Sequence, residues 1–163
     1  MLVFGGVDPG KTGAICMLFQ TSSNEEFIRF IDNKTDPIEI VNKLSSVKDS
    51  YEPNFYIEDV HSLYGMSAKS NFSFGRQVER ASLLLYLSKI PIHLVQPKVW
   101  QTTVGMIRTK QSSKIDAFNI CKNLYPTIIP ELLGPRGGIK DGRVDALLIA
   151  YYAKLIYGEQ NGT

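Results

Sequence analysis

The stretch "FGGVDPGKTG", Phe4 to Gly13, decides the fold class of this chain. It contains the letters G-x-x-x-x-G-K-T, which are typical of a phosphate-binding P-loop. A P-loop leads into a helix, because the phosphates sit at the helix N-terminus. Here the next residues, "GAICMLFQ", are apolar and β-prone, and they predict a strand. Asp8 would also repel a phosphate inside the cradle. We therefore favour a turn between two strands, in which Asp8 ends the first strand and is a candidate metal ligand. "FYIED" further along resembles the acidic strand of a P-loop enzyme, so the nucleotide-binding alternative stays open at this point.

Outward from this turn, the hydrophobic pattern predicts an α/β fold with a mixed sheet and helices on both faces. Three strands come first and are followed by alternating helices and strands, which favours antiparallel pairing at the start and parallel pairing later. Strands are expected at residues 2–7, 12–20, 25–32, 54–60 and 90–95. Helices are expected from an Asp36-Pro37 cap to about 49, and at about 70–88, 97–104, 113–125 and 141–157.

Length and composition predict one domain over residues 1–163. At 44% hydrophobic and 21% charged, the 163 residues match an ordinary globular domain. No apolar run approaches the roughly 20 residues of a membrane span, so no membrane partner is expected. The first residues show neither a charged leader nor a cleavage site, and we expect a cytoplasmic protein. Cys16 and Cys121 lack metal-ligand spacing and are expected to be buried thiols.

Acidic residues occur at three places that a sheet of this kind brings to one edge. Asp8 ends the first strand, Glu58 lies near the end of the fourth, and Asp141 and Asp145 are four apart on one face of the last helix. Such a cluster is suited to Mg²⁺ or Mn²⁺, and two such ions can activate water against a phosphodiester. Each residue alone also has an ordinary interpretation: a surface carboxylate for Glu58, an N-cap for Asp141 and a solvated helix face for Asp145. Against the last, Asp145 lies beside an apolar stripe, where an unpaired carboxylate is costly.

With these residues in order, the chain resembles the RuvC-type Holliday junction resolvases of the RNase H-like superfamily. The motifs "GVDPGKTGAI", "FYIEDV" and "DGRVDALLIA" resemble the three acidic motifs of that family. The segment "QPKVWQTTVG", followed by "SSKIDAFNICKNLYP", resembles the phage and chloroplast branch. One departure is the spacing of the last acidic pair, which is four here and three in well-known bacterial members. The match is firmer for Asp145 than for Asp141, because Asp145 carries the "DAL" part of the motif.

This resemblance implies a five-stranded sheet of order 3-2-1-4-5 and Mg²⁺-dependent hydrolysis of phosphodiesters in four-way DNA junctions. It implies that Asp8, Glu58, Asp141 and Asp145 are catalytic and hold two Mg²⁺ ions, with Mn²⁺ able to substitute, and that no nucleotide cofactor is used. It also implies a homodimer, because two symmetric nicks need two sites. The helix at about 70–88 is the expected contact, since its "ASLLLYL" is more apolar than one core face requires.

Charge is distributed unevenly along the chain in a way that favours a DNA partner. Residues 1–60 carry 5 basic and 10 acidic residues, whereas residues 61–122 carry 9 basic and 2 acidic residues. The alternative is a set of solvated helix faces. Basic residues of this middle segment are expected to contact phosphates; they are Lys69, Arg76, Arg80, Lys98, Arg108, Lys110 and Lys114. Phe72 and Phe74 are expected either in the core or as a wedge that stacks on bases at the crossover.

Two other classes remain to be separated from a nuclease. Sugar-kinase and actin-like ATPases share this core, but they need two such domains and further phosphate loops. A non-catalytic DNA-binding relative is less favoured, since all four acidic positions are intact. His61 and His93 are expected to be structural.

Overall fold

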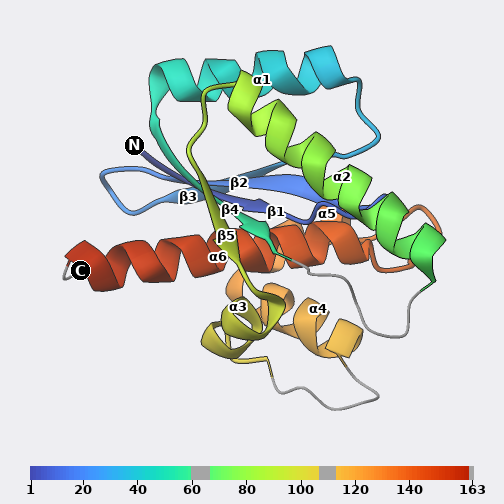
Figure 1. Cartoon of the computed structure of the whole chain (residues 1–163). Coiled ribbons are helices and arrows are strands. Elements are labelled where there is room, and N and C mark those ends of the chain that lie inside the picture. The colour runs from blue at the N-terminus through green and yellow to red at the C-terminus, as the bar shows by residue number, and fades with distance from the viewer. Residues whose placement is uncertain (60–66, 107–112, 162–163) are drawn as a thin grey trace.

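The computed structural model describes residues 1–59, 67–106 and 113–161 of the chain. Five strands form one sheet of order β3-β2-β1-β4-β5, with helices on both of its faces (Figure 1). The strands are β1 (Leu2–Val7), β2 (Ala14–Gln20), β3 (Glu26–Asp32), β4 (Glu52–Glu58) and β5 (Ile92–Val95). The longer helices are α1 (Pro37–Ser50), α2 (Ala68–Leu87), α4 (Ser113–Leu124) and α6 (Asp141–Asn161). The shorter ones are α3 (Pro97–Thr103), η1 (Pro126–Ile128) and α5 (Ile129–Leu132).

The central strands explain the apolar runs that open the sequence. β1 pairs antiparallel with β2 and parallel with β4, so it is covered on both faces and almost every residue in it is buried. β2 is buried in the same way, whereas the edge strand β3 alternates between exposed and covered positions. The chain from Phe4 to Gly13 therefore runs from a strand through a tight turn into a strand. No helix follows "GKT", and the prediction of a strand rather than a P-loop is confirmed.

Two hydrophobic cores lie on opposite faces of the sheet. α1 and α2 cover one face, and α6, with α3 and α4 beside it, covers the other (Figure 1). Trp100 of α3 is fully buried in the core on the α6 face. Within the described residues, no helix is long and apolar enough to cross a membrane.

Glycines let α6 lie directly against the sheet. A Cβ atom on Gly6 of β1 would lie 2.1 Å from the carbonyl oxygen of Ala146 and 2.3 Å from the amide nitrogen of Ala150. A Cβ atom on Gly142, in the first turn of α6, would lie 2.3 Å from the carbonyl oxygen of Thr12. Both contacts are with backbone, which cannot move aside as a flexible side chain can. Gly6 thus lets α6 lie against β1, and Gly142 lets the first turn of α6 lie against the β1–β2 turn.

The predicted elements agree with the structure except for small shifts. β2 begins at Ala14 rather than at residue 12, because Thr12 and Gly13 belong to the turn, and β4 begins two residues earlier than predicted. The helices η1 and α5 were not predicted. Both begin next to a proline, at Pro126 and Pro130, and are too short to show a helical repeat. Cys16 and Cys121 are buried thiols, as expected.

Candidate active site

Asp8 and Glu58 lie at the same edge of the sheet because β1 and β4 are parallel neighbours. Val7 is the register partner of Ile57, so the residues that follow them leave the sheet side by side. Glu58 is the last residue of β4, and its side chain is turned toward the α6 face, where it meets Trp100. This edge is the carboxyl end of the parallel strands, which is where open α/β sheets place their ligands.

α6 brings the remaining two carboxylates to this edge. Asp141 is its first residue, and Asp145 is one turn further on. The contact of Gly142 with the β1–β2 turn holds this end of the helix beside the residue that follows β1. The four acidic residues, separated by up to 137 positions in sequence, therefore lie at one edge, near enough for their charges to interact.

The turn that carries Asp8 is held rigidly by hydrogen bonds. The Gly10 amide donates to Asp8 Oδ1 at 2.8 Å, and the Asp8 amide donates to the Ala14 carbonyl at 3.1 Å. Asn33 Nδ2, from the β3–α1 turn, donates to the Asp8 carbonyl at 2.9 Å and to the Gly10 carbonyl at 2.8 Å. Sequence reasoning missed Asn33. An asparagine directly after a strand was the available signal, since such side chains often bind nearby backbone.

Glu58 is oriented by a buried indole. Trp100 Nε1 donates to Glu58 Oε1 at 3.0 Å, from a ring that has no exposed surface. This bond partly offsets the cost of burying the carboxylate. The sequence showed Trp100 only as part of a family-like segment and not as a partner of Glu58. The single tryptophan of the chain is thus a positioning residue for the candidate site.

Burial and mutual repulsion raise the pKa values of three of the carboxyl groups. Desolvation is the largest cause for Asp8 and Glu58; the Gly10 and Trp100 hydrogen bonds lower these pKa values, and the charges of Asp141 on Asp8 and of Asp8 on Glu58 raise them. Asp145 is affected most: desolvation, followed by the charges of Asp8, Glu58 and Asp141, raises its pKa to about 7. The carboxylates are therefore close enough to destabilise one another's charged forms. Such a cluster is typical of a functional site.

Asp141 has a basic partner from another helix. Lys114 of α4 forms an ion pair with its Oδ2 atom, and this hydrogen bond raises the pKa of Lys114. Lys114 was predicted to contact DNA; here its ammonium group reaches the acidic cluster. Its side chain is 72% exposed, so it lies where a substrate phosphate could also reach it.

The donor set at this edge fits a divalent cation. Mg²⁺ and Mn²⁺ prefer carboxylate oxygens, and a cation would relieve the repulsion that raises the pKa of Asp145. Among the described residues, no three His, Cys, Asp or Glu side chains are already arranged as a metal site. Glu58 and Asp141 are directed instead at Trp100 and Lys114. Cation binding to Asp141 would therefore compete with Lys114.

The predicted DNA contacts differ in how accessible they are. Lys69, Arg76 and Lys98 are exposed on α2 and α3, and Phe72 is 70% exposed, so Phe72 is not a core residue, whereas Phe74 is half-buried. Arg80 donates to the backbone carbonyls of Asn33 at 3.0 Å and Thr35 at 3.4 Å. Arg108, Lys110 and His61 lie outside the described residues. His93 stacks on Tyr56 with ring centroids 5.0 Å apart, in line with a structural role.

Comparisons with known proteins identify the fold. No family model matches the chain, and no curated protein matches it. Among solved structures, RuvC of T. thermophilus in complex with a Holliday junction substrate matches with a TM-score of 0.59 and 13% identity, over 97% of this chain and 96% of that one. A second Thermus thermophilus RuvC structure matches with a TM-score of 0.57 and 12% identity, over 95% and 96%. The chain therefore has the RNase H-like fold in its RuvC-like form, as predicted. Membership of the phage and chloroplast branch stays a prediction.

Proposed function

We propose that this protein is a structure-selective endodeoxyribonuclease that resolves four-way DNA junctions by paired symmetric nicks. The observation that carries the proposal is the meeting of Asp8, Glu58, Asp141 and Asp145 at the carboxyl edge of an RNase H-like sheet. The fold match supports it, since one of the matching RuvC structures is described in complex with a Holliday junction substrate.

In this proposal, the chain supplies a rigid acidic site to which the scissile phosphate is brought. Two Mg²⁺ ions, or Mn²⁺ in their place, would be held by the four carboxylates and would supply the activation of water and the neutralisation of the leaving oxygen. Asn33 fixes the backbone of the turn that carries Asp8, and Trp100 fixes Glu58. In this proposal, Lys114 pairs with Asp141 while no metal ion is bound. Once Asp141 binds a metal ion, Lys114 is close enough to contact a phosphate.

The DNA surface in this proposal is the basic middle of the chain. Lys69, Arg76 and Lys98 are exposed and fix the position of the phosphate backbone. Phe72, exposed at the N-terminal part of α2, is the aromatic residue available to stack on an unpaired base at the crossover. A junction has a branch point at which strands exchange and base stacking is more easily opened than in a linear duplex, and this difference is the basis of the proposed selectivity.

The main test compares the wild-type chain with the Asp8→Asn variant. We expect the wild type to cut synthetic four-way junctions in Mg²⁺ and to leave a linear duplex of the same sequence uncut. Asp8→Asn should lower the cleavage rate by about 10³-fold or more, because it removes a charged ligand. Junction affinity should be nearly unchanged, since Asp8 is not itself one of the proposed basic phosphate contacts. Gel assays of cleavage and fluorescence anisotropy of binding provide the two measurements.

A matched control is Asp49→Asn, which changes an exposed aspartate near the end of α1. It should cut as the wild type does. Undiminished cutting by Asp8→Asn, or a wild type that binds junctions without cutting them, would rule out this active site. The second outcome would instead support a non-catalytic binding protein.

We also propose that the chain acts as a homodimer through α2 and β5. Large apolar side chains lie unusually exposed on these two elements; they are Leu83 (51%), Tyr86 (75%), Leu87 (54%) and Leu94 (62%). A second copy of the chain fits this surface because paired nicks need two sites in a fixed symmetric relation. The half of α2 that bears Leu83, Tyr86 and Leu87 also lies well away from Phe72.

The dimer is tested by Tyr86→Lys. Placing a charge in the centre of an apolar contact should raise the dimer dissociation constant on the order of 30-fold, as for a typical aromatic hot spot. Light scattering after size exclusion measures this change. Ile38→Lys is the matched control, since Ile38 is 71% exposed on α1 and should leave the dimer intact. A wild type that stays monomeric at high concentration would contradict the proposal.

A further inference from the structure

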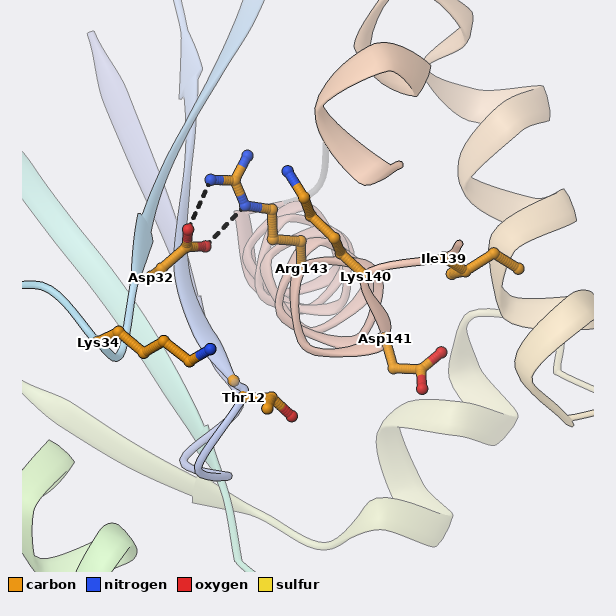
Figure 2. A pocket seen from close by; sticks show the side chains of 8 residues that line it. Thr12, Asp32, Lys34, Ile139, Lys140, Asp141 and Arg143 are labelled. Atoms are coloured by element: carbon orange, nitrogen blue, oxygen red, sulfur yellow. Dashed lines mark hydrogen bonds and ion pairs between the residues drawn. The ribbon is translucent and has the colours of Figure 1, made fainter. Parts of the chain in front are cut away.

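A cavity of about 380 Å³ lies directly beside Asp141. It is formed where the β1–β2 turn, the β3–α1 turn and the first turn of α6 meet. Figure 2 shows its lining: Lys34 extends from the β3–α1 turn toward Thr12, and Asp141 lies at the far end from Asp32. The cavity therefore adjoins the acidic cluster and shares one carboxylate with it.

One wall of the cavity is formed by an arginine and an aspartate whose side chains are held in place and whose charges neutralise each other. Arg143 donates to Asp32 through Nε at 2.7 Å and through Nη2 at 2.9 Å, as the dashed lines in Figure 2 mark. A bidentate ion pair of this kind, with two parallel hydrogen bonds, fixes the orientation of both side chains. Nη1 of Arg143 also donates to the Glu131 carbonyl at 3.1 Å. Arg143 thus builds the wall rather than offering its charge to a ligand.

Two lysines of the lining keep their charge available. Lys34 is exposed in the β3–α1 turn, and Lys140 donates to the neutral Glu131 carbonyl at 3.3 Å; at longer range, the charges of both lysines also lower the pKa of Asp32. Among the described residues, neither ammonium group forms an ion pair with a carboxylate. The other carboxylate of the lining, Asp141, is paired with Lys114, which lies outside the cavity. The cavity therefore has an excess of positive charge.

Neutral donors and the helix add to this preference. Thr12 is exposed and offers a hydroxyl group to the same space. The cavity also lies at the N-terminal end of a 21-residue helix, where the helix dipole favours a negatively charged group. A group with several acceptor oxygens and one negative charge, such as a phosphodiester, matches this lining better than an apolar or a cationic ligand.

We propose that this cavity is a phosphate subsite that holds the backbone phosphate next to the one that is cut, on the same DNA strand. Lys34 and Thr12 contact the phosphate, and Lys140 supplies a second positive charge. The inference rests on the proposed nuclease function, since that function places the scissile phosphate at the carboxylates. The subsite fixes the register of the strand, so that only one phosphate reaches the acidic edge.

The test measures binding and needs no cleavage. The full chain carrying Asp8→Asn is titrated against a four-way junction at a series of salt concentrations, with and without Lys34→Ala. Loss of one phosphate contact should reduce the slope of log affinity against log salt by about 0.9. Single phosphates near the cut site are then replaced, one at a time, by neutral methylphosphonates. One replacement should weaken binding by the protein that keeps Lys34 and should have a clearly smaller effect in the Lys34→Ala background, where only Thr12 and Lys140 remain.

Two further variants keep the result interpretable. Thr12→Val retains the shape of the side chain but removes its hydroxyl group. It should therefore weaken the contact with the phosphate at the same position of the strand. Lys43→Ala removes an exposed lysine of α1, on the opposite face of the sheet, and should leave the methylphosphonate profile unchanged. Circular dichroism confirms that each variant is folded.

The outcomes separate the subsite from the nuclease proposal. If the wild type cuts junctions while Lys34→Ala keeps both the salt slope and the methylphosphonate profile, the subsite alone is overturned. If the wild type binds but never cuts, the nuclease proposal is overturned, and the same scan still decides whether Lys34 holds a phosphate. A chain that does not bind DNA overturns both.

Discussion

α6 and α2 are the two longest helices of the structure, with 21 and 20 residues, and they are packed in different ways. α6 runs along one face of the sheet, and buried residues continue from Gly142 to Ala153 (Figure 1). α2 crosses the other face, and its buried residues are only Ala81, Leu84 and Leu85. α6 touches the backbone of β1 directly, while α2 leaves apolar side chains exposed.

This difference shows how each helix relates to the candidate site. α6 carries two of the four carboxylates, so its position relative to β1 sets the geometry of the site. α2 is linked to the site through Arg80, which donates to the carbonyl of Asn33, and Asn33 in turn donates to the turn that carries Asp8. Changes on the site-facing side of α6 should therefore have large effects, and most changes on α2 should have small ones.

The largest expected effect on stability comes from Asp145→Asn on α6. Desolvation, followed by the neighbouring carboxylates, raises the pKa of Asp145 to about 7 from an ordinary value of 3.8. The folded chain thus binds the proton more tightly than the unfolded chain does. This contribution to stability is fully present below about pH 4 and is lost as the pH rises through 7. In metal-free buffer, Asp145→Asn should raise the free energy of unfolding at pH 8 by up to about 4 kcal/mol, with little change at pH 4.

Urea unfolding at both pH values, with a chelator present, measures this gain. Glu79→Gln on α2 is the matched control; Glu79 is exposed, and its loss should change stability by less than about 0.5 kcal/mol at either pH. Adding Mg²⁺ should then stabilise the wild type more than Asp145→Asn. An equal gain in the free energy of unfolding at pH 4 and pH 8 would mean that the surroundings of Asp145 do not raise its pKa.

Much of the fold could be predicted from the sequence, because the residues of each element themselves indicate that element. The run from Leu2 to Val7 and the Asp36-Pro37 cap each define an element by their own residues; Asp36 Oδ1 accepts from the Ile38 amide at 2.9 Å, as such a cap requires. The meeting of Asp8 with Glu58 also follows from local signals, since two adjacent parallel strands must end at one edge.

The contacts that hold the site together could not be predicted from the sequence in this way. The bond from Trp100 to Glu58 spans 42 positions, and the pair of Arg143 with Asp32 spans 111. Neither leaves a periodic pattern, because a single side chain meets a distant one only after the sheet has formed. The role of Gly6 is similar: in sequence it is a glycine within a strand, and only the packed helix shows why a larger residue is excluded.

A smaller effect is expected from Gly6→Ala, which tests the contact between α6 and β1. The new methyl group would lie 2.1 Å from a backbone carbonyl of α6, so the helix must shift. Overpacking of this kind typically costs about 1–3 kcal/mol of unfolding free energy. Because Asp141 and Asp145 move with the helix, junction cleavage should fall as well. Thermal unfolding and the cleavage assay measure the two effects.

The matched control for this change is Gly75→Ala on α2, where nothing lies within 4 Å of the added methyl group. Because glycine weakens a helix interior, this change should stabilise the chain by roughly 0.5–1 kcal/mol. Opposite signs for the two substitutions would support the contrast between the helices. A loss at Gly75 as large as that at Gly6 would contradict it.

The smallest expected effect concerns Arg80, which links α2 to the site. Arg80→Gln removes hydrogen bonds to the carbonyls of Asn33 and Thr35, and should lower the free energy of unfolding by about 1 kcal/mol. Because the guanidinium group is already engaged within the protein, the salt dependence of junction binding should stay unchanged. Arg76→Gln, at an exposed position one turn earlier on α2, should do the reverse: stability is kept, and the salt slope falls by about 0.9. A reduced salt slope for Arg80→Gln would instead make Arg80 a phosphate contact, and α2 would then reach the DNA through both arginines.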